Sequence, residues 1–411
     1  MLVFFFFVPY NPHYWFKDSL LKGDLHKMKK FLASILAVSM MATAAFAADN
    51  VVRIGVFEPA SGDSGAGGKQ EILGIQYANK IAPEVEIAGK KYTVELVYAD
   101  NGSSTDKAPT AAQKLVSSDV SVVLGSYGSG VSIAGSQYFA DAGVPAIGLS
   151  CTNPQVTAGN SHYFRVCFLD PFQGTVLANY AFKVLGAKTA YILGELGNDY
   201  DIGLCHYFQV AFEALGGKVI ADTFPTGNSD FTSYLTNAAM YGADVFFCPV
   251  SLAYSTQIVA QAGGQGAEFP ILGGDTLDSN KTAEAAKNAQ VKLIVSTFYQ
   301  EGGSPEFDSG FKAWLNEDKE AMTNNGGNDM IAAVSVMGYD GYFTALEALK
   351  ASASPDPKDV NKALWGVTLK GVSGQIAFDS TGDAIRDSAF LKVVNLETGT
   401  WDFLVEQKVG E

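Results

Sequence analysis

From Val51 onward the chain alternates between short apolar segments and segments with helical spacing, and this alternation constrains the fold more than any other feature. Val51 to Phe57 is apolar on both faces, a Gly/Ser-rich loop follows at Ser61 to Gly68, and Glu71 to Lys80 then places Ile72, Ile75 and Ala78 on one side of a helix. Eight further segments read as strands: Tyr92 to Ala99, Val120 to Gly125, Pro145 to Gly148, Thr189 to Leu193, Lys218 to Asp222, Val245 to Cys248, Ile271 to Gly273 and Lys292 to Ser296. Apolar strands separated by helices are typical of doubly wound parallel sheets covered on both faces, so the pattern predicts an α/β fold.

The number of strands is too large for one sheet, and we therefore predict two lobes. After Ser296 the pattern changes to two helices, at about Pro305 to Asn316 and Ile331 to Ala351, followed by a closing β-segment. A tail of this kind has to rejoin both sheets. The predicted first lobe comprises residues 48–168 with 300–376, and the second lobe comprises residues 169–299 with 377–411. Several chain segments would join the lobes as a hinge, near Phe168–Phe172, Ser296–Glu301 and Gly374–Phe378.

The first 47 residues are expected to direct export rather than to fold. Basic residues at Lys29 and Lys30 precede an apolar run from Phe31 to Met41, and small residues follow up to Ala47. This is the order of a signal peptide over residues 28–47, cut after Ala47, and it predicts a periplasmic protein. Residues 1–27 are either a mis-assigned start or an extended n-region.

Charge and composition exclude several classes of function. The formal net charge is -15 and the sequence has no Lys/Arg-rich block, so nucleic acid binding is not expected. Of the four histidines only His162 and His206 follow the signal segment, and no Cys/His pair has the spacing of metal ligands. We therefore expect no metal, no cofactor and no catalytic residues. The best case for an enzyme is Cys151 as a nucleophile with one of these histidines as base, but a packed or disulfide-bonded cysteine is the more ordinary reading.

The four cysteines leave the redox chemistry open. Their even number in an exported chain allows two disulfides in three connectivities, yet all four lie in or beside apolar segments, where buried free thiols are also common. They are Cys151, Cys167, Cys205 and Cys248.

Polar and aromatic residues follow several of the predicted strands, and ligands of open α/β sheets bind outside the carboxyl ends of the strands. The residues singled out on this ground are Tyr127, Ser129, Ser150, Thr152, Tyr200, Ser251 and Asp275. A Ser/Gly helix start offers free N–H groups to an anion, an acidic side chain on the opposite wall can bind an ammonium group, and a tyrosine can cover the ligand. A purely structural role would also explain each residue, as a helix cap, a packed aromatic ring or a turn residue.

The ensemble of motifs resembles the leucine/isoleucine/valine-binding family of type I periplasmic solute-binding proteins, which deliver ligands to ABC importers. The resemblance covers nearly the whole chain after the signal segment. It rests on Ile54 to Gly62, Gly125 to Ser132, Pro145 to Thr157, Phe164 and Arg165, Asp170 to Gly174, Asn198 to Tyr200 and Gly374 to Asp383.

The resemblance implies a role for each residue of the site. Ser129 would bind the α-carboxylate of an amino acid, helped by the Thr152 N–H. The Ser150 carbonyl, the Thr152 hydroxyl and Asp275 would bind the α-ammonium, and Tyr200 would close over the ligand. The implied partners are a small-molecule ligand, most simply an L-amino acid, and an ABC transporter permease. The protein would be a monomer that touches the inner membrane only by docking on that permease.

Three departures from the family pattern concern the other end of the ligand. Gly67 stands where leucine binders carry an aromatic residue, Tyr127 replaces a smaller contact, and Ser251 replaces an aromatic residue of the second lobe. We therefore do not predict leucine. A polar, aromatic or larger amino acid fits these departures, and so does an amide or urea-like solute. A ligand sensor with the same fold remains the alternative to a transport protein.

Overall fold

The computed structural model describes residues 50–386 and 388–408. The predicted signal segment, residues 28–47, and residues 1–27 lie outside the described residues. From Val51 onward the chain forms one unit by its internal contacts.

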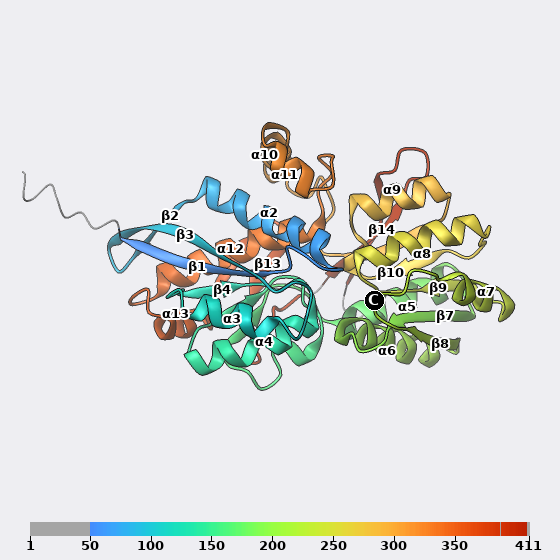
Figure 1. Ribbon diagram of the computed structural model, residues 1–411, viewed down its shortest axis with the longest axis horizontal. Coiled ribbons are helices and arrows are strands. Elements are labelled where there is room, and N and C mark those ends of the chain that lie inside the picture. Colours follow the sequence, from blue (N-terminus) through green and yellow to red (C-terminus); the bar gives the residue numbers. More distant parts are fainter. Residues whose placement is uncertain (1–49, 387, 409–411) are drawn as a thin grey trace, which may run out of the picture. The chain divides into compact units, whose positions relative to one another are not determined.

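The first sheet has six strands in the order β2-β3-β1-β4-β5-β6 (Figure 1). All neighbours pair in parallel except β2, which pairs antiparallel with β3 at the edge of the sheet. The strands are β1 (Val51–Glu58), β2 (Glu84–Ile87), β3 (Lys90–Asp100), β4 (Val122–Leu124), β5 (Ala146–Gly148) and β6 (Tyr163–Arg165).

Helices cover this sheet on both faces because neighbouring strand residues point to opposite sides. Val122 and Leu124 pack with α2 and α12, whereas Val123 between them packs with α3 and α4. The helices of this lobe are α2 (Gly65–Ile81), α3 (Ala108–Val116), α4 (Ser129–Ala142), α12 (Ala333–Ala351) and α13 (Pro357–Leu364). Figure 1 shows α2 and α12 on the side of the sheet opposite to α3 and α4.

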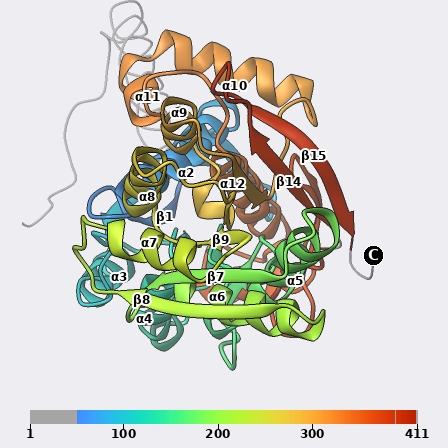
Figure 2. The same ribbon diagram turned by 90° about the vertical axis from the view of Figure 1, so that its right-hand side faces the viewer.

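The second sheet has seven strands in the order β15-β14-β11-β10-β9-β7-β8. Its five strands from β8 to β11 are parallel, and the hairpin of β14 and β15 adds two antiparallel strands at the edge, visible in Figure 2. The strands are β7 (Thr189–Glu195), β8 (Lys218–Phe224), β9 (Val245–Phe247), β10 (Ile271–Gly273), β11 (Leu293–Thr297), β14 (Ser388–Val394) and β15 (Trp401–Lys408).

This sheet is covered in the same way as the first. Phe247 and Leu272 pack against α5 and α6, and Phe246 and Ile271 pack against α7, α8 and α9 on the other face. The helices are α5 (Asp170–Asn179), which continues as a π-helical turn (Tyr180–Val184), α6 (Asp199–Ala214), α7 (Thr232–Met240), α8 (Leu252–Gly264) and α9 (Asn280–Ala289). Two parallel sheets, each covered on both faces, confirm the predicted α/β class.

The tail returns first to one sheet and then to the other. α10 (Pro305–Glu317) and α11 (Lys319–Asn324) lead into α12, which packs closely along α2. A small hairpin of β12 (Thr368–Gly371) and β13 (Gly374–Ala377) precedes β14. Two of the three predicted hinge segments meet in space, since the Phe168 ring lies 4.4 Å from that of Phe298. The lobe boundaries themselves stay a prediction.

One local expectation is wrong. The Gly/Ser-rich stretch predicted as a loop from Ser61 to Gly68 becomes helical at Gly65, six residues before the expected helix start. Packing explains the glycines better than backbone flexibility, because a Cβ on Gly67 would lie 2.5 Å from the Tyr127 ring and one on Gly68 would meet the carbonyl of Pro59. Close approach of the helix therefore overrides the low helix propensity of glycine. No helix among the described residues has the length and apolar character needed to cross a membrane.

Candidate functional site

The first sheet contributes the loops that follow β4 and β5 to the candidate site. Tyr127 lies between β4 and α4, Ser129 is the first residue of α4, Ser150 and Thr152 follow β5, and all four residues are buried. Because β4 and β5 are parallel, their carboxyl ends lie at the same edge of the sheet. The structure thus places four of the seven predicted residues at one edge.

Ser129 is the first residue of α4, so its backbone N–H has no acceptor within the helix. Gly128 precedes it with φ of 100°, a conformation that glycine adopts without steric cost. The Ser129 hydroxyl accepts a hydrogen bond from the N–H of Asn153 at 3.1 Å, which ties the loops after β4 and β5 together. A hydroxyl that accepts one hydrogen bond still has its own hydrogen to donate, and N–H groups at a helix start suit an anion.

The second sheet contributes Tyr200, Ser251 and Asp275 from the loops at its own carboxyl edge. Tyr200 lies in the first turn of α6, Ser251 directly precedes α8, and Asp275 begins a short 3-10 segment after β10. The Tyr200 hydroxyl donates to Oδ1 of Asp275 at 3.1 Å, and Nε2 of Gln173 in α5 donates to the same oxygen at 2.8 Å. The carboxylate is therefore held from one side only, and its Oδ2 is left without a hydrogen bond.

The loops of the two sheets face and touch each other. Hydrogen bonds cross between the lobes, among them Tyr127 hydroxyl to Thr276 carbonyl at 3.5 Å, Asn153 Nδ2 to Asp199 carbonyl at 2.8 Å, and Tyr254 hydroxyl to Asp63 Oδ2 at 3.0 Å. All seven predicted residues consequently lie at facing strand ends, in an arrangement in which the two lobes are closed on one another. Their roles in binding stay predictions.

Buried oxygen atoms without partners gather in these loops. Four of the seven predicted residues carry one: Ser150 (Oγ), Thr152 (Oγ1), Ser251 (Oγ) and Asp275 (Oδ2). Buried polar groups in folded proteins are ordinarily hydrogen-bonded, so a cluster of exceptions needs an explanation.

Three acidic residues and one glutamine of the same region were not predicted from the sequence. They are Glu58 at the end of β1, Glu71 in α2, and Asp170 and Gln173 in α5, and each has at least one buried side-chain oxygen without a hydrogen bond. The strand-end rule would have found Glu58. Asp170 and Gln173 lie in a segment that carries the family resemblance, but nothing in the sequence marked the helical residues as part of a site, because polar residues in helices usually face solvent.

Burial dominates the electrostatics of these carboxyl groups. It raises the pKa of Asp275 to about 6, against the opposing effect of the hydrogen bonds from Gln173 and Tyr200. It raises the pKa of Asp170 to about 8, which the nearby Thr152 hydroxyl partly offsets, and Asp275 adds to the increase. Loss of hydration thus outweighs the effect of the neighbouring polar groups at both carboxyl groups.

The glutamates show the same effect. Burial raises the pKa of Glu71 to about 8, against the effect of the nearby Ser150 hydroxyl, and Asp275 raises it further. Burial also raises the pKa of Glu58 well above its usual range, with a second contribution from the charge of Glu71. The influence of Asp275 on Glu71 shows that the carboxyl groups of the two lobes lie within electrostatic reach of each other.

Tyr127 accounts for one departure from the family pattern. Its ring fills the space beside Gly67 and its hydroxyl reaches the second lobe. An aromatic side chain is therefore present next to the first helix, but it comes from the loop after β4 and not from the loop before α2.

The cysteines do not form an active centre. All four are free thiols, which settles the disulfide question left open by the sequence. Burial raises the pKa of Cys151 to about 11, so the thiolate required of a nucleophile is not formed near neutral pH.

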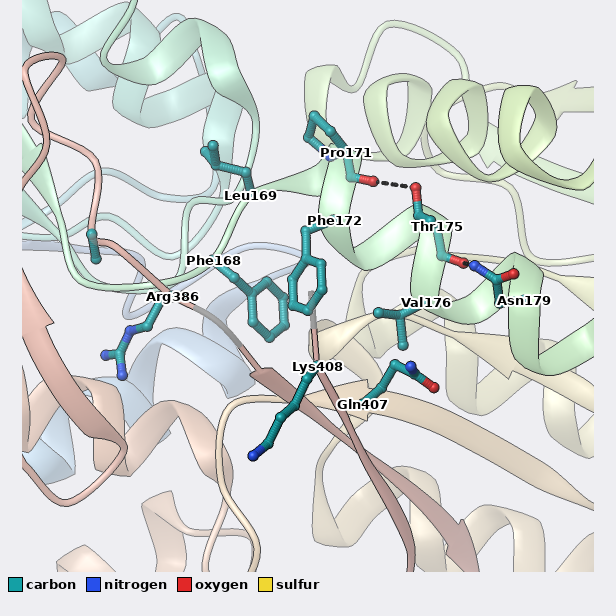
Figure 3. A pocket seen from close by; sticks show the side chains of 11 residues that line it. Phe168, Leu169, Pro171, Phe172, Thr175, Val176, Asn179, Arg386, Gln407 and Lys408 are labelled. Carbon is teal, nitrogen blue, oxygen red and sulfur yellow. Dashed lines mark hydrogen bonds between the residues drawn. The ribbon is translucent and has the colours of Figure 1, made fainter. Parts of the chain in front are cut away.

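A separate cavity lies at the first predicted hinge segment, outside the candidate site. Its volume is about 380 Å³, and Figure 3 shows the rings of Phe168 and Phe172 side by side in it, with Arg386, Gln407 and Lys408 around them. It contains none of the seven predicted residues. The hinge is thus not the place where the polar loops converge.

The comparisons with known proteins agree with this architecture. A sequence model of the family described as periplasmic binding protein matches residues 51–400. A Leu/Ile/Val-binding protein homolog of Brucella abortus is 29% identical over 369 residues, which cover 87% of this chain and 94% of the relative.

Solved structures give the same result. The leucine-binding protein LivK of Thermotoga maritima is 30% identical with a TM-score of 0.78, and the match covers 87% of this chain and 99% of that one. The branched-chain amino acid transporter substrate-binding protein LivJ of Streptococcus pneumoniae, solved with isoleucine, is 26% identical with a TM-score of 0.76, covering 88% and 99% of the two chains. The resemblance inferred from the sequence motifs is confirmed. The chain belongs to the periplasmic binding protein family and is a solute-binding protein of the ABC-transporter type, not an enzyme.

Proposed function

We propose that this protein binds an L-amino acid, or a solute with the same ammonium and carboxylate groups, between its two lobes and delivers it to an ABC transporter permease. The observation that carries the proposal is the set of unpartnered buried oxygens on Ser150, Thr152, Ser251 and Asp275. Leaving such groups without hydrogen bonds costs about 1–3 kcal/mol each, and a polar ligand would remove that cost. The relatives named above, which bind branched-chain amino acids according to their descriptions, support the same class.

The protein offers groups of suitable chemistry to both the carboxylate and the ammonium group of the ligand. The N-terminus of α4, with Ser129 as its first residue, suits a carboxylate, because free N–H groups and the helix dipole both favour an anion. The free oxygens of Thr152 and Asp275 suit an ammonium group, to which charge-assisted hydrogen bonds are strong. Tyr200, held by Asp275, forms the cover from the second lobe.

Closure of the lobes follows from this division of contacts. A ligand that touches Ser129 on one lobe and Asp275 on the other stabilises the closed form, and only by the contacts that the open form lacks. Bending would occur at the segments around Phe168 and Phe298, and the closed form would be recognised by the permease. The remaining parts of the proposal are a monomer, export by the segment 28–47 with cleavage after Ala47, and release into the periplasm.

The test is thermal unfolding of the purified protein, freed of co-purified solute by unfolding and refolding, in the presence of L-amino acids, amides, urea and sugars. A true ligand at one hundred times its Kd should stabilise the protein by about 2.7 kcal/mol. Asp275→Asn should weaken that ligand by about 10- to 100-fold, since one charge-assisted hydrogen bond is lost. Asp222→Asn is the matched control, because this exposed carboxylate contacts Tyr191 outside the site and should leave affinity unchanged.

Two results would contradict the proposal. Stabilisation by amides, urea or sugars without any response to amino acids would keep the fold and overturn the ligand class. Equal affinity of Asp275→Asn and the parent protein for a bound amino acid would place the ammonium group elsewhere.

A further inference from the structure

Glu58 and Glu71 form a buried carboxyl pair beside the proposed amino-acid site. Their exposed fractions are 1% and 0%. One oxygen of Glu58 accepts a hydrogen bond from the N–H of Tyr127 at 2.6 Å, while the other oxygen and both oxygens of Glu71 have no hydrogen bond. Three carboxyl oxygens are thus buried and unpartnered in one place.

The pair lies next to a residue of the candidate site, since Glu58 accepts the N–H of Tyr127. Glu71 lies close to the Ser150 hydroxyl and within electrostatic reach of Asp275 on the other lobe. The Tyr127 hydroxyl reaches the second lobe. Burial raises the pKa of Tyr127 well above its usual range, and the charges of Asp275, Glu71 and Glu58 add to the increase. The unpartnered Ser150 hydroxyl and Asp275 Oδ2 are independent signs that a ligand group belongs at this point.

No cationic side chain of the described part of the chain neutralises these carboxyl groups. The two buried cations are occupied elsewhere, Arg165 by Asp383 and Lys392 by Asp278, and none of the ion pairs in residues 50–386 and 388–408 includes Glu58 or Glu71. The acidic groups of these residues are also not arranged to hold a metal ion. Among the described residues, these carboxyl oxygens are therefore left for a group from outside the chain.

Building on the proposed function, we propose that the solute is a basic amino acid whose side-chain ammonium or guanidinium group binds Glu71, with Glu58 as the second acceptor. The α-carboxylate and α-ammonium groups would use Ser129, Thr152 and Asp275, which leaves the glutamates for the side chain. A cation with several N–H donors supplies both the charge and the hydrogen bonds that the three oxygens lack. An apolar side chain such as that of leucine would supply neither.

Isothermal titration of the solute-free protein with L-lysine, L-ornithine, L-arginine, L-glutamine and L-leucine tests this inference. We expect at least one basic amino acid to bind about 100-fold more tightly than L-leucine and L-glutamine. Glu71→Gln should weaken the basic ligand by about 10-fold or more while changing the affinity for neutral amino acids by less than about threefold. Glu86→Gln, a substitution of the same type on the exposed edge strand β2, should change neither affinity.

The outcomes separate this inference from the proposed function. Tight binding of neutral amino acids without a preference for basic ones overturns the inference and leaves the proposed function standing, whereas no response to any amino acid overturns both. If Glu71→Gln fails to fold, the selectivity of the parent protein and the affinity of Glu58→Gln for the basic ligand decide the matter. Unchanged affinity in both variants would overturn the role of the pair even if a basic amino acid binds.

Discussion

Two buried groups of ionisable residues in this protein differ in whether their side chains have hydrogen-bond partners. At the edge of the first sheet, Arg165 donates to Asp383 at 2.5 Å, to the Thr157 hydroxyl at 2.8 Å, and to two backbone carbonyls. Between the lobes, Glu71 and Asp170 are buried just as deeply, and neither has a hydrogen bond to any of its carboxyl oxygens.

The difference separates a group that serves the fold from a group that, under the proposed function, serves a ligand. A buried ion pair with all its hydrogen bonds made holds chain segments together, here β6 and the segment before β14. Unpartnered buried carboxyl groups destabilise the free protein, and a protein retains them where something else completes them. The molecule thus carries a finished structural site at Arg165 and Asp383 and, between the lobes, the unfinished site to which the proposed function assigns the ligand.

The largest effect should come from removing the cation of the finished site. Arg165→Met leaves Asp383 and Thr157 without their partner, and we expect the free energy of unfolding in urea to fall by about 3–5 kcal/mol. Arg53→Met is the matched control, since its pair with Glu95 is exposed and should contribute about 0–1 kcal/mol. Similar losses in the two variants would contradict a structural role for Arg165.

The unfinished site should make the solute-free protein lose stability as the pH rises from about 5 to about 8. The pKa of Glu71 and that of Asp170 are raised to about 8, so in this range the folded protein holds protons that the unfolded chain has released. Each group lowers the free energy of unfolding by up to about 1.4 kcal/mol per pH unit, and we expect a total loss of at least about 2 kcal/mol. Urea unfolding across this range measures the loss.

Two additions to that experiment sharpen it. Glu71→Gln removes one titrating group and should make the decline shallower, because a glutamine has no proton to release. A saturating cationic ligand favours the ionised carboxylates and should also reduce the slope. A stability that is constant or rises between these pH values would show that the carboxyl groups are not buried in the solute-free protein.

The smallest effect on the free energy of unfolding is expected from substituting two buried threonines. They differ in whether their hydroxyl groups have hydrogen-bond partners. Thr157→Val removes a hydroxyl bonded to both Arg165 and Asp383 and should cost about 1–2 kcal/mol of unfolding free energy. Thr152→Val removes an unpartnered hydroxyl and should change stability by less than about 0.5 kcal/mol while weakening ligand binding. The reverse order of stabilities would break the distinction between the two sites.

Much of the architecture follows from local patterns. Strands apolar on both faces, such as Val122–Leu124, require helices on both sides of the sheet, and parallel strands require their carboxyl ends at one edge. For that reason Ser150, Thr152 and Asp275 could be selected from their positions in the sequence alone. The extension of α2 into the glycines at Gly65 was missed because local propensity argues against it and only close packing explains it.

The sequence by itself determined the α/β class, the two sheets and the loops in which polar side chains had to gather, because these depend on periodicity and chain direction. Only the tertiary structure decided which of those side chains have partners. Arg165 and Asp383 lie 218 positions apart in the chain, and Glu71 comes within electrostatic reach of Asp275 only after both lobes have formed. Hydrogen bonding and loss of hydration depend on distances in space, so the finished site and the unfinished one look alike until the chain is folded.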